Sequence, residues 1–164
     1  SYETKNIRNV CLLGHGGSGK TTLAESMLYM TGAIDRQGKA ADGNTVCDYD
    51  AEEIKRQITI ATSVAPVNFG GCKINVLDCP GYFDFVGDVL AAIRVVETGI
   101  IFCSAKDGIT VGAERSWKYL KAAGVPAMFY ISKIDEENAD YEKAYNSLRD
   151  AFGISVTPFI CESS

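Results

Sequence analysis

A glycine-rich segment near the start of the chain has the residue types and spacing needed to hold a phosphate group. Residues 14–21 read Gly-His-Gly-Gly-Ser-Gly-Lys-Thr, which matches the pattern G-x-x-x-x-G-K-[S/T]. The glycines let the backbone curl so that several N–H groups face one centre, where an anion can bind at the N-terminus of a helix. Lys20 would reach the β- and γ-phosphates of a nucleotide, and the Thr21 hydroxyl would bind Mg²⁺.

The flanking residues favour this interpretation over an incidental glycine-rich turn. Ile7–Leu13 is an apolar run that predicts a buried strand, and a helical spacing of apolar side chains extends from about Gly19 to Thr31. A strand before the loop and a helix after it are the context that the motif requires. We therefore expect the phosphates to lie against Gly14, His15, Gly16, Gly17, Ser18, Gly19, Lys20, Thr21 and Thr22.

A second group of chemically useful residues follows another apolar strand, Lys73–Leu77. Asp78 comes directly after it and begins the sequence Asp-Cys-Pro-Gly. In a protein with a phosphate-binding loop this strand lies beside the first one, so the Asp78 carboxylate can support Mg²⁺. Gly81 leaves its backbone N–H free to approach a γ-phosphate, which a side chain would obstruct.

A third group, Ser132-Lys133-Ile134-Asp135, resembles the guanine-reading pattern [N/T]-K-x-D. The Asp135 carboxylate can accept hydrogen bonds from the N1–H and N2–H₂ groups of guanine, while the Lys133 stem lies along the base. Adenine offers no matching donors, and a buried carboxylate left unpaired would cost ~1–3 kcal/mol. The segment alone is equally compatible with a charged loop. Its position after an apolar strand and downstream of the phosphate loop favours guanine binding.

The elements that position these residues alternate along the chain. Short β-branched runs alternate with helical periodicities, which predicts a mostly parallel sheet. Thr59–Phe69 and Lys73–Leu77 are joined by Gly70-Gly71, so these two strands should be antiparallel. The expected fold class is α/β: a P-loop NTPase with a doubly wound, mostly parallel sheet, one antiparallel strand and three α/β/α layers. Further elements are expected as helices at 84–97, 112–123 and 139–152 and as strands at 100–103, 125–131 and 156–161.

The composition narrows the class of protein and its setting. A chain of 164 residues that is 46% hydrophobic is about one domain with a substantial core. A net charge of −5 argues against direct, sequence-specific nucleic-acid binding by this domain. The six cysteines form no C-x-x-C pair, which favours a reduced, cytoplasmic setting. We see neither a signal-peptide core nor an apolar run of transmembrane length, so we expect no membrane partner.

A polar segment between Gly32 and Ile58 shows no clear periodicity. Long loops of this kind in compact domains are usually functional or disordered. Because the segment follows the phosphate loop and its helix, we interpret it as a mobile element that senses the ligand.

Together these motifs resemble the translational GTPases, most closely the G domain of elongation factor G and its elongation-factor-G-like paralogues, over nearly the whole chain. The resemblance implies binding of GTP and GDP, Mg²⁺-dependent hydrolysis of GTP, and action on the ribosome through the full-length factor. It implies a first switch at residues 33–60, where Thr59 matches the threonine that binds Mg²⁺ and contacts the γ-phosphate, and a second switch at residues 78–88. The implied metal ligands are Thr21, Thr59 and Asp78, and the implied catalytic residues are Lys20, Thr59, Gly81 and Tyr82.

Four positions depart from the family pattern. Tyr82 stands where elongation factors carry the histidine that orients the attacking water. A tyrosine hydroxyl can bond to water but, unlike imidazole, cannot carry a positive charge at neutral pH. We therefore expect a low intrinsic rate of hydrolysis, and the paralogue subgroup, which tolerates Tyr there, is favoured. The other three departures are Gly17 for an aspartate, Gln57 for a glycine and Ser132 for an asparagine.

The end of the chain does not contain a clear fifth guanine-nucleotide element. On the resemblance, residues 1–164 are expected to form a G domain that stops before its last strand and helix. Two alternatives to the GTPase domain of an elongation-factor-G-like protein remain open: a GTP/GDP-binding switch with little hydrolysis, and the G domain of a tetracycline-resistance-type ribosomal protection protein. A nucleoside-monophosphate kinase or an ATPase would leave the segments around Thr59 and Asp135 unexplained.

Overall fold

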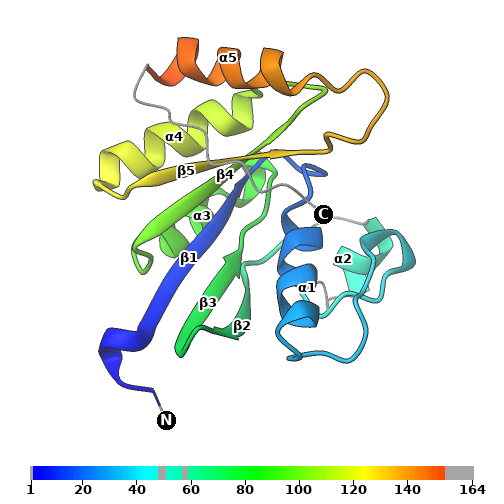
Figure 1. The fold of residues 1–164 in the computed structure, drawn as a ribbon, viewed down its shortest axis with the longest axis vertical. Coiled ribbons are helices and arrows are strands. Elements are labelled where there is room, and N and C mark those ends of the chain that lie inside the picture. Colours follow the sequence, from blue (N-terminus) through cyan, green and yellow to red (C-terminus); the bar gives the residue numbers. More distant parts are fainter. Residues whose placement is uncertain (1, 48–50, 57–58, 154–164) are drawn as a thin grey trace.

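A mixed β-sheet carries the motifs of the chain. In the computed structural model, which describes residues 2–47, 51–56 and 59–153, five strands pair in the order β2-β3-β1-β4-β5 (Figure 1). The central strand is β1 (Ile7–Gly14), between β3 (Cys72–Asp78) and β4 (Thr98–Ser104), and the edges are β2 (Ser63–Phe69) and β5 (Ala127–Ser132). β2 runs antiparallel to β3, and the remaining pairs are parallel. The expected mostly parallel sheet with one antiparallel strand is confirmed.

The β2–β3 hairpin turns at Gly70-Gly71 as expected, but β2 is shorter than predicted. Phe69 pairs with Cys72 at the turn, and the pairing ends where Ser63 meets Asp78. The prediction that this strand begins at Thr59 is wrong, because residues 59–62 do not join the sheet. The backbone N–H groups of residues 60 and 61 bond instead to a glutamate side chain.

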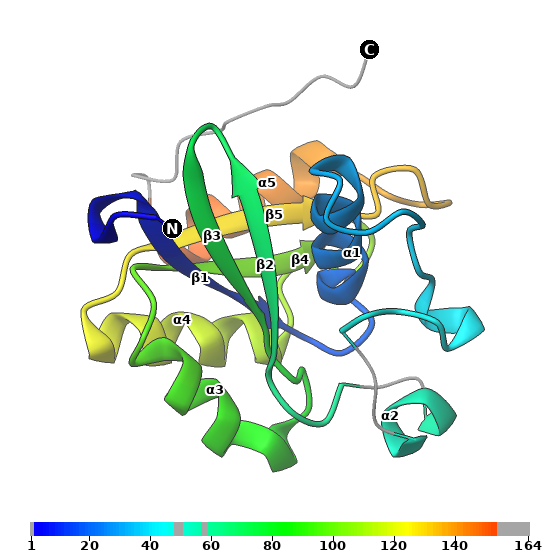
Figure 2. The same ribbon diagram turned by 90° about the horizontal axis from the view of Figure 1, so that it is seen from below.

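Helices cover both faces of the sheet (Figures 1 and 2). On one face lies α1 (Lys20–Met30), and on the other lie α3 (Val86–Ile93), α4 (Val111–Ala123) and α5 (Tyr141–Phe152). β1 contributes to both cores: Leu12 packs on the α1 side, and its two neighbours, Cys11 and Leu13, pack on the opposite side. This alternation follows from the two-residue period of a strand. The three α/β/α layers are therefore observed as expected.

Side-chain caps fix the starts of two helices close to the predicted positions. The Thr110 hydroxyl accepts a hydrogen bond from the backbone N–H of Ala113 at 3.2 Å, at the start of α4. The Asp140 carboxylate does the same for Lys143 at 2.9 Å, at the start of α5. The helix expected at 84–97 is shorter than predicted at both ends, because a 3₁₀ turn, η3 (Phe83–Phe85), precedes α3 and because α3 ends at Ile93.

Besides η3, the described residues contain three short elements that were not anticipated. The 3₁₀ turn η1 (Thr4–Asn6) precedes β1, and both η2 (Ala40–Asp42) and α2 (Ala51–Arg56) lie in the polar segment that lacks periodicity. The strand predicted at 156–161 lies outside the described residues. Within the described part of the chain, no helix has the length and apolar character needed to cross a bilayer.

Candidate functional site

The loop of residues 14–21 connects the carboxyl end of β1 to the start of α1, as the motif requires. Gly17 and Gly19 have φ angles of 78° and 98°, in the left-handed region that side chains rarely adopt. Gly19 directly precedes α1, and the N–H groups of the first turn of a helix point toward the residues that precede it. Thr22, which directly follows the loop, is exposed on the first turn of α1.

The side chain of Lys20 is buried against the inside of this loop. Its ammonium group donates hydrogen bonds to the carbonyl oxygens of Gly14 at 3.3 Å and His15 at 2.9 Å. The Ser18 hydroxyl donates to the same His15 carbonyl at 2.7 Å. These bonds hold one positive charge beside the glycine backbone, which is the electrostatic requirement for binding a polyphosphate.

Three oxygen-bearing side chains meet at the C-terminal end of the loop. The Thr21 hydroxyl donates a 2.5 Å hydrogen bond to the Asp78 carboxylate and lies 3.4 Å from the Thr59 hydroxyl oxygen. Asp78 is fully buried at the end of β3. The structure thus brings together the three residues for which the sequence suggests a metal-binding role, from three separate segments.

This donor set fits Mg²⁺ in type. Mg²⁺ prefers hard oxygen ligands and is usually held by one or two carboxylates together with substrate phosphates and water. Among the described residues, no group of three or more His, Cys, Asp or Glu side chains gathers as a metal cage. One carboxylate and two hydroxyls at a phosphate loop therefore suit a cation that arrives with its nucleotide.

The segment after β3 lies directly on the phosphate loop. A Cβ atom added to Gly81 would come 2.4 Å from the backbone nitrogen of Gly16, and one added to Gly16 would come 2.7 Å from Cε2 of Tyr82. The Tyr82 ring therefore covers residue 16, with its centroid 6.4 Å from that of His15. Its side chain is 43% exposed, so water can reach the hydroxyl.

The residues of the guanine-type motif follow β5 and contact the same loop. The buried Ser132 hydroxyl donates to the carbonyl oxygen of Ser18 at 2.7 Å, which ties the two motifs together. Lys133 adopts a φ of 57°, and its ammonium lies 3.2 Å from the Glu136 carboxylate. Asp135 is exposed, so a base could reach its carboxylate from solvent.

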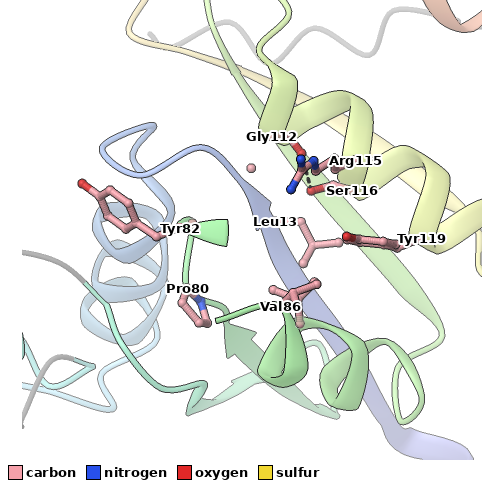
Figure 3. A pocket seen from close by; sticks show the side chains of 11 residues that line it. Leu13, Pro80, Tyr82, Val86, Gly112, Arg115, Ser116 and Tyr119 are labelled. Carbon is pink, nitrogen blue, oxygen red and sulfur yellow. Dashed lines mark hydrogen bonds between the residues drawn. The ribbon is translucent and has the colours of Figure 1, made fainter. Parts of the chain in front are cut away.

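A separate cleft lies on the α3–α4 side of the loop. Figure 3 shows Leu13, Val86 and Tyr119 facing this space, with Arg115 and Ser116 along α4 and the Tyr82 side chain pointing away from it. Of the predicted site residues only Gly14, Gly81 and Tyr82 contribute to its lining. The cleft is thus not the phosphate loop itself, although the two share an edge.

Cys79, next to Asp78, is not poised as a nucleophile. Its side-chain hydrogen bond with Cys11, together with burial, raises the pKa of the Cys79 thiol far above its ordinary value. The Cys79 thiol also lies 3.7 Å from the carbonyl oxygen of Leu77, to which it donates. A neutral thiol is a poor nucleophile.

Two buried glutamates near the site were not singled out in the sequence. Glu25, on α1, is fully buried and accepts hydrogen bonds from the backbone N–H groups of Gly38, Val46 and Cys47. Glu53, on α2, is 2% exposed. For Glu25 a signal existed, because it lies between Ala24 and Leu28 on the buried face of a helix. For Glu53 none did, since α2 is six residues long and too short to reveal a period.

Comparison with known proteins identifies relatives over almost the whole chain. The family model described as the elongation factor Tu GTP binding domain matches residues 5–164. An elongation factor G-like protein of Mycobacterium tuberculosis is 36% identical over 157 residues, which are 96% of this chain and 22% of that protein. A tetracycline resistance protein TetM of Enterococcus faecalis is 34% identical over 150 residues, which are 92% of this chain and 24% of that protein.

A solved structure is also similar to most of the chain. A crystal structure of a protein from Thermus thermophilus superposes with a TM-score of 0.87 and 41% sequence identity, over 90% of this chain and 22% of that chain. The present chain thus spans about a fifth of the length of the curated relatives it matches.

Proposed function

The chain belongs to the family of elongation factor Tu GTP binding domains, and we propose that it binds GTP and GDP together with Mg²⁺ and hydrolyses GTP as part of an elongation-factor-G-like protein. The observation that carries the proposal is the meeting of Thr21, Thr59 and Asp78 beside Lys20. In the proposed roles, residues 33–60 form a first switch and residues 78–88 a second.

Each proposed role follows from the position of a side chain. Lys20 would hold the β- and γ-phosphate oxygens, and Thr21, Thr59 and Asp78 would hold the cation. When bound, Mg²⁺ supplies neutralisation of the charge that develops on the phosphates. The chain itself contributes by positioning and by electrostatic stabilisation from fixed N–H groups, which is how most phosphoryl transfer is catalysed.

The second switch would contribute Gly81 and Tyr82. The close approach of Gly81 to the backbone of Gly16 supports a role in which its N–H faces the terminal phosphate. The Tyr82 ring lies over residue 16. Its hydroxyl could accept a hydrogen bond from the attacking water or donate one to it. It cannot supply the positive charge of an imidazolium, so we expect hydrolysis to be slow without a partner.

Base selection would come from Ser132, Lys133 and Asp135. The bond between Ser132 and the Ser18 carbonyl fixes this segment to the phosphate loop. A nucleotide with its phosphates on that loop would then extend its base toward Asp135. There a carboxylate accepts from the N1–H and N2–H₂ groups of guanine, and adenine has neither of these two donors.

Two observations keep the alternatives open. Tyr82 favours a GTP/GDP-binding switch with little hydrolysis. The similarity to TetM favours a ribosomal protection protein. In each case we propose that the ribosome is the partner and that the intact protein, rather than this domain alone, makes the contact.

Single-turnover hydrolysis of GTP by the intact protein, measured with and without ribosomes, tests the proposal. We expect ribosome-stimulated hydrolysis that Lys20→Ala reduces by about a hundredfold or more, because the variant lacks the charge at the phosphates. A matched control is Lys106→Ala, which removes an exposed lysine outside the loop. Stimulated hydrolysis that is equal in the wild type and in Lys20→Ala would contradict these roles.

A further inference from the structure

A buried carboxylate, that of Glu53, is hydrogen-bonded to the backbone next to Thr59. Glu53 is 2% exposed, and its Oε1 atom accepts hydrogen bonds from the backbone N–H groups of Ile60 at 2.9 Å and Ala61 at 3.2 Å. These are the two residues that directly follow Thr59. Hydrogen bonds to an ionised acceptor are roughly twice as strong as neutral ones, so this is a firm attachment for a short piece of backbone.

Thr59 needs an attachment of this kind because regular structure does not hold it. Residues 59–62 lie between α2 and β2 and belong to neither element. The Thr59 hydroxyl nevertheless lies 3.4 Å from that of Thr21, at the proposed Mg²⁺ position. A hydroxyl at this position requires a fixed backbone at Thr59. Glu53 contributes to this by accepting hydrogen bonds from the backbone N–H groups of the next two residues, Ile60 and Ala61.

The helix that carries Glu53 is itself anchored to the preceding loop. A Cβ atom added to Gly43 would come 2.7 Å from Cγ2 of Ile54, so α2 packs closely on the backbone there. Glu25 of α1 in turn binds the N–H groups of Val46 and Cys47. The attachments thus run from α1 through residues 43–47 to α2, and from α2 to Thr59.

We propose that Glu53 is a positioning residue, which holds the backbone next to Thr59 so that the threonine hydroxyl stays at the proposed Mg²⁺ site. The proposal rests on the proposed function, because it is the triphosphate complex that would use Thr59. In the proposed role Glu53 acts through the N–H groups of Ile60 and Ala61 and not by contact with the nucleotide.

The role predicts a selective defect. Replacing Glu53 by Ala leaves two N–H groups without their acceptor and frees the segment that carries Thr59. The diphosphate complex, which lacks the γ-phosphate, should be little affected. The Mg²⁺–triphosphate complex should lose affinity, and the maximal rate of hydrolysis should fall with it.

The first measurement is amide hydrogen exchange of the intact protein without nucleotide. In Glu53→Ala, exchange at Ile60 and Ala61 should become faster by roughly tenfold or more, while strand amides keep their protection. The matched control is Lys55→Ala, on the exposed face of the same helix, which should leave both amides unchanged. Unchanged exchange at Ile60 and Ala61 in Glu53→Ala overturns the proposal.

The second measurement is nucleotide affinity at millimolar Mg²⁺. We expect Glu53→Ala to bind a non-hydrolysable GTP analogue about tenfold more weakly and GDP within about twofold of the wild type. Equal losses for both nucleotides, or none for either, would show that the glutamate has only a structural role and would overturn the proposal.

If Glu53→Ala does not fold, Glu53→Gln decides the question, because it keeps the volume and one acceptor oxygen but loses the charge. An affinity for the GTP analogue that is about threefold lower than in the wild type, with GDP affinity retained, supports the proposal. Equal changes in affinity for the two nucleotides overturn it. The failure of the proposed function is a separate result: the wild type would bind neither nucleotide, while the exchange data would still report on the Glu53 attachment.

Discussion

At the scale of single residues, the absence of a side chain at position 16 decides where Tyr82 lies. The aromatic ring occupies the space that a Cβ atom at this position would need, with Cε2 at 2.7 Å and Cζ at 3.0 Å from it. The segment proposed as a second switch can therefore rest on the phosphate loop. A larger residue at position 16 would have to displace the ring.

Gly16→Ala should move Tyr82 without unfolding the protein, because the clash is with the end of a flexible side chain and not with backbone. If Tyr82 helps to place the attacking water, we expect the maximal rate of ribosome-stimulated hydrolysis to fall by about tenfold, with GDP affinity nearly unchanged. Single-turnover kinetics and GDP titration check this. Tyr82→Phe, which keeps the ring and removes the hydroxyl, should show a comparable fall, and full activity in both variants would contradict a role for Tyr82.

The buried cysteines give a second prediction at this scale. Burial raises the pKa of the Cys103 thiol to about 12, and a side-chain hydrogen bond with Cys11, together with burial, raises the pKa of the Cys79 thiol above its ordinary value. Both thiols should thus resist alkylation at pH 8 in the folded protein, whereas the half-buried Cys72 should react. Peptide mapping after brief iodoacetamide treatment measures this, and rapid labelling of Cys79 in folded protein would contradict it.

The sign of the pH dependence follows from the same shift. The unfolded chain releases the Cys103 proton near pH 9.0, while the folded chain retains it up to about 12. The contribution of Cys103 to the free energy of unfolding is therefore fully present below pH 9.0, and it is lost as the pH rises from 9.0 to about 12. Denaturant unfolding of wild type and Cys103→Ala should show a steeper loss in the wild type, and parallel pH profiles would argue against the shift.

At the scale of elements, side-chain carboxylates bind the described parts of the polar segment between α1 and β2, and these parts form no strand. Glu25 accepts from the N–H groups of Gly38, Val46 and Cys47, and Glu53 accepts from those of Ile60 and Ala61. The segment is thus attached at discrete points to two helices. Such attachments can be released one at a time, which suits an element that responds to a ligand.

Glu25→Ala should destabilise the whole fold. It leaves three backbone N–H groups without their carboxylate, of which those of Gly38 and Cys47 form fully buried hydrogen bonds. We expect the free energy of unfolding to fall by about 3 kcal/mol, measured by denaturant titration. Glu114→Ala, at an exposed position of α4, should change it by less than about 1 kcal/mol. Equal changes in the two variants would show that the Glu25 bonds contribute little.

Much of the element order could be predicted from the sequence, because hydrophobic period and caps are local signals. α4 and α5 begin within two residues of the predicted positions, next to Thr110 and Asp140. What could not be predicted depends on contacts distant in sequence. β2 begins at Ser63 and not at Thr59, because the backbone N–H groups of residues 60 and 61 donate to the Glu53 carboxylate and not to a neighbouring strand. The hydropathy pattern does not indicate these hydrogen bonds.

At the scale of the whole molecule, the sheet topology gathers the motifs. The phosphate loop follows β1, Asp78 ends β3, and the Ser132–Asp135 segment follows β5. Parallel strands place their carboxyl ends at one edge, where α/β proteins bind ligands. The sequence could therefore predict that these residues meet. It could not predict the direct bond between Ser132 and Ser18, because that depends on how far each loop extends beyond the sheet.

The proposed selectivity for guanine depends on two distant parts of the chain. The loop after β1 would hold the phosphates, and the segment after β5 would bind the base. Asp135→Asn exchanges a carboxylate for an amide that both donates and accepts, and xanthine offers a carbonyl oxygen where guanine offers N2–H₂. We expect the preference to shift from GTP toward xanthosine triphosphate by tenfold or more, measured by competition binding. Asp107→Asn, in the turn after β4, is the control and should retain guanine preference. Unchanged GTP affinity in Asp135→Asn would remove this residue from the base site.

The most direct test of the account is calorimetric titration of the intact, folded protein with GDP and with a non-hydrolysable GTP analogue, at millimolar Mg²⁺. We predict saturable binding of both guanine nucleotides, none of the corresponding adenine nucleotides, and weaker binding of the GTP analogue when Mg²⁺ is removed by chelation. Absence of heat with either guanine nucleotide, in protein that circular dichroism shows to be folded, would contradict the central claim.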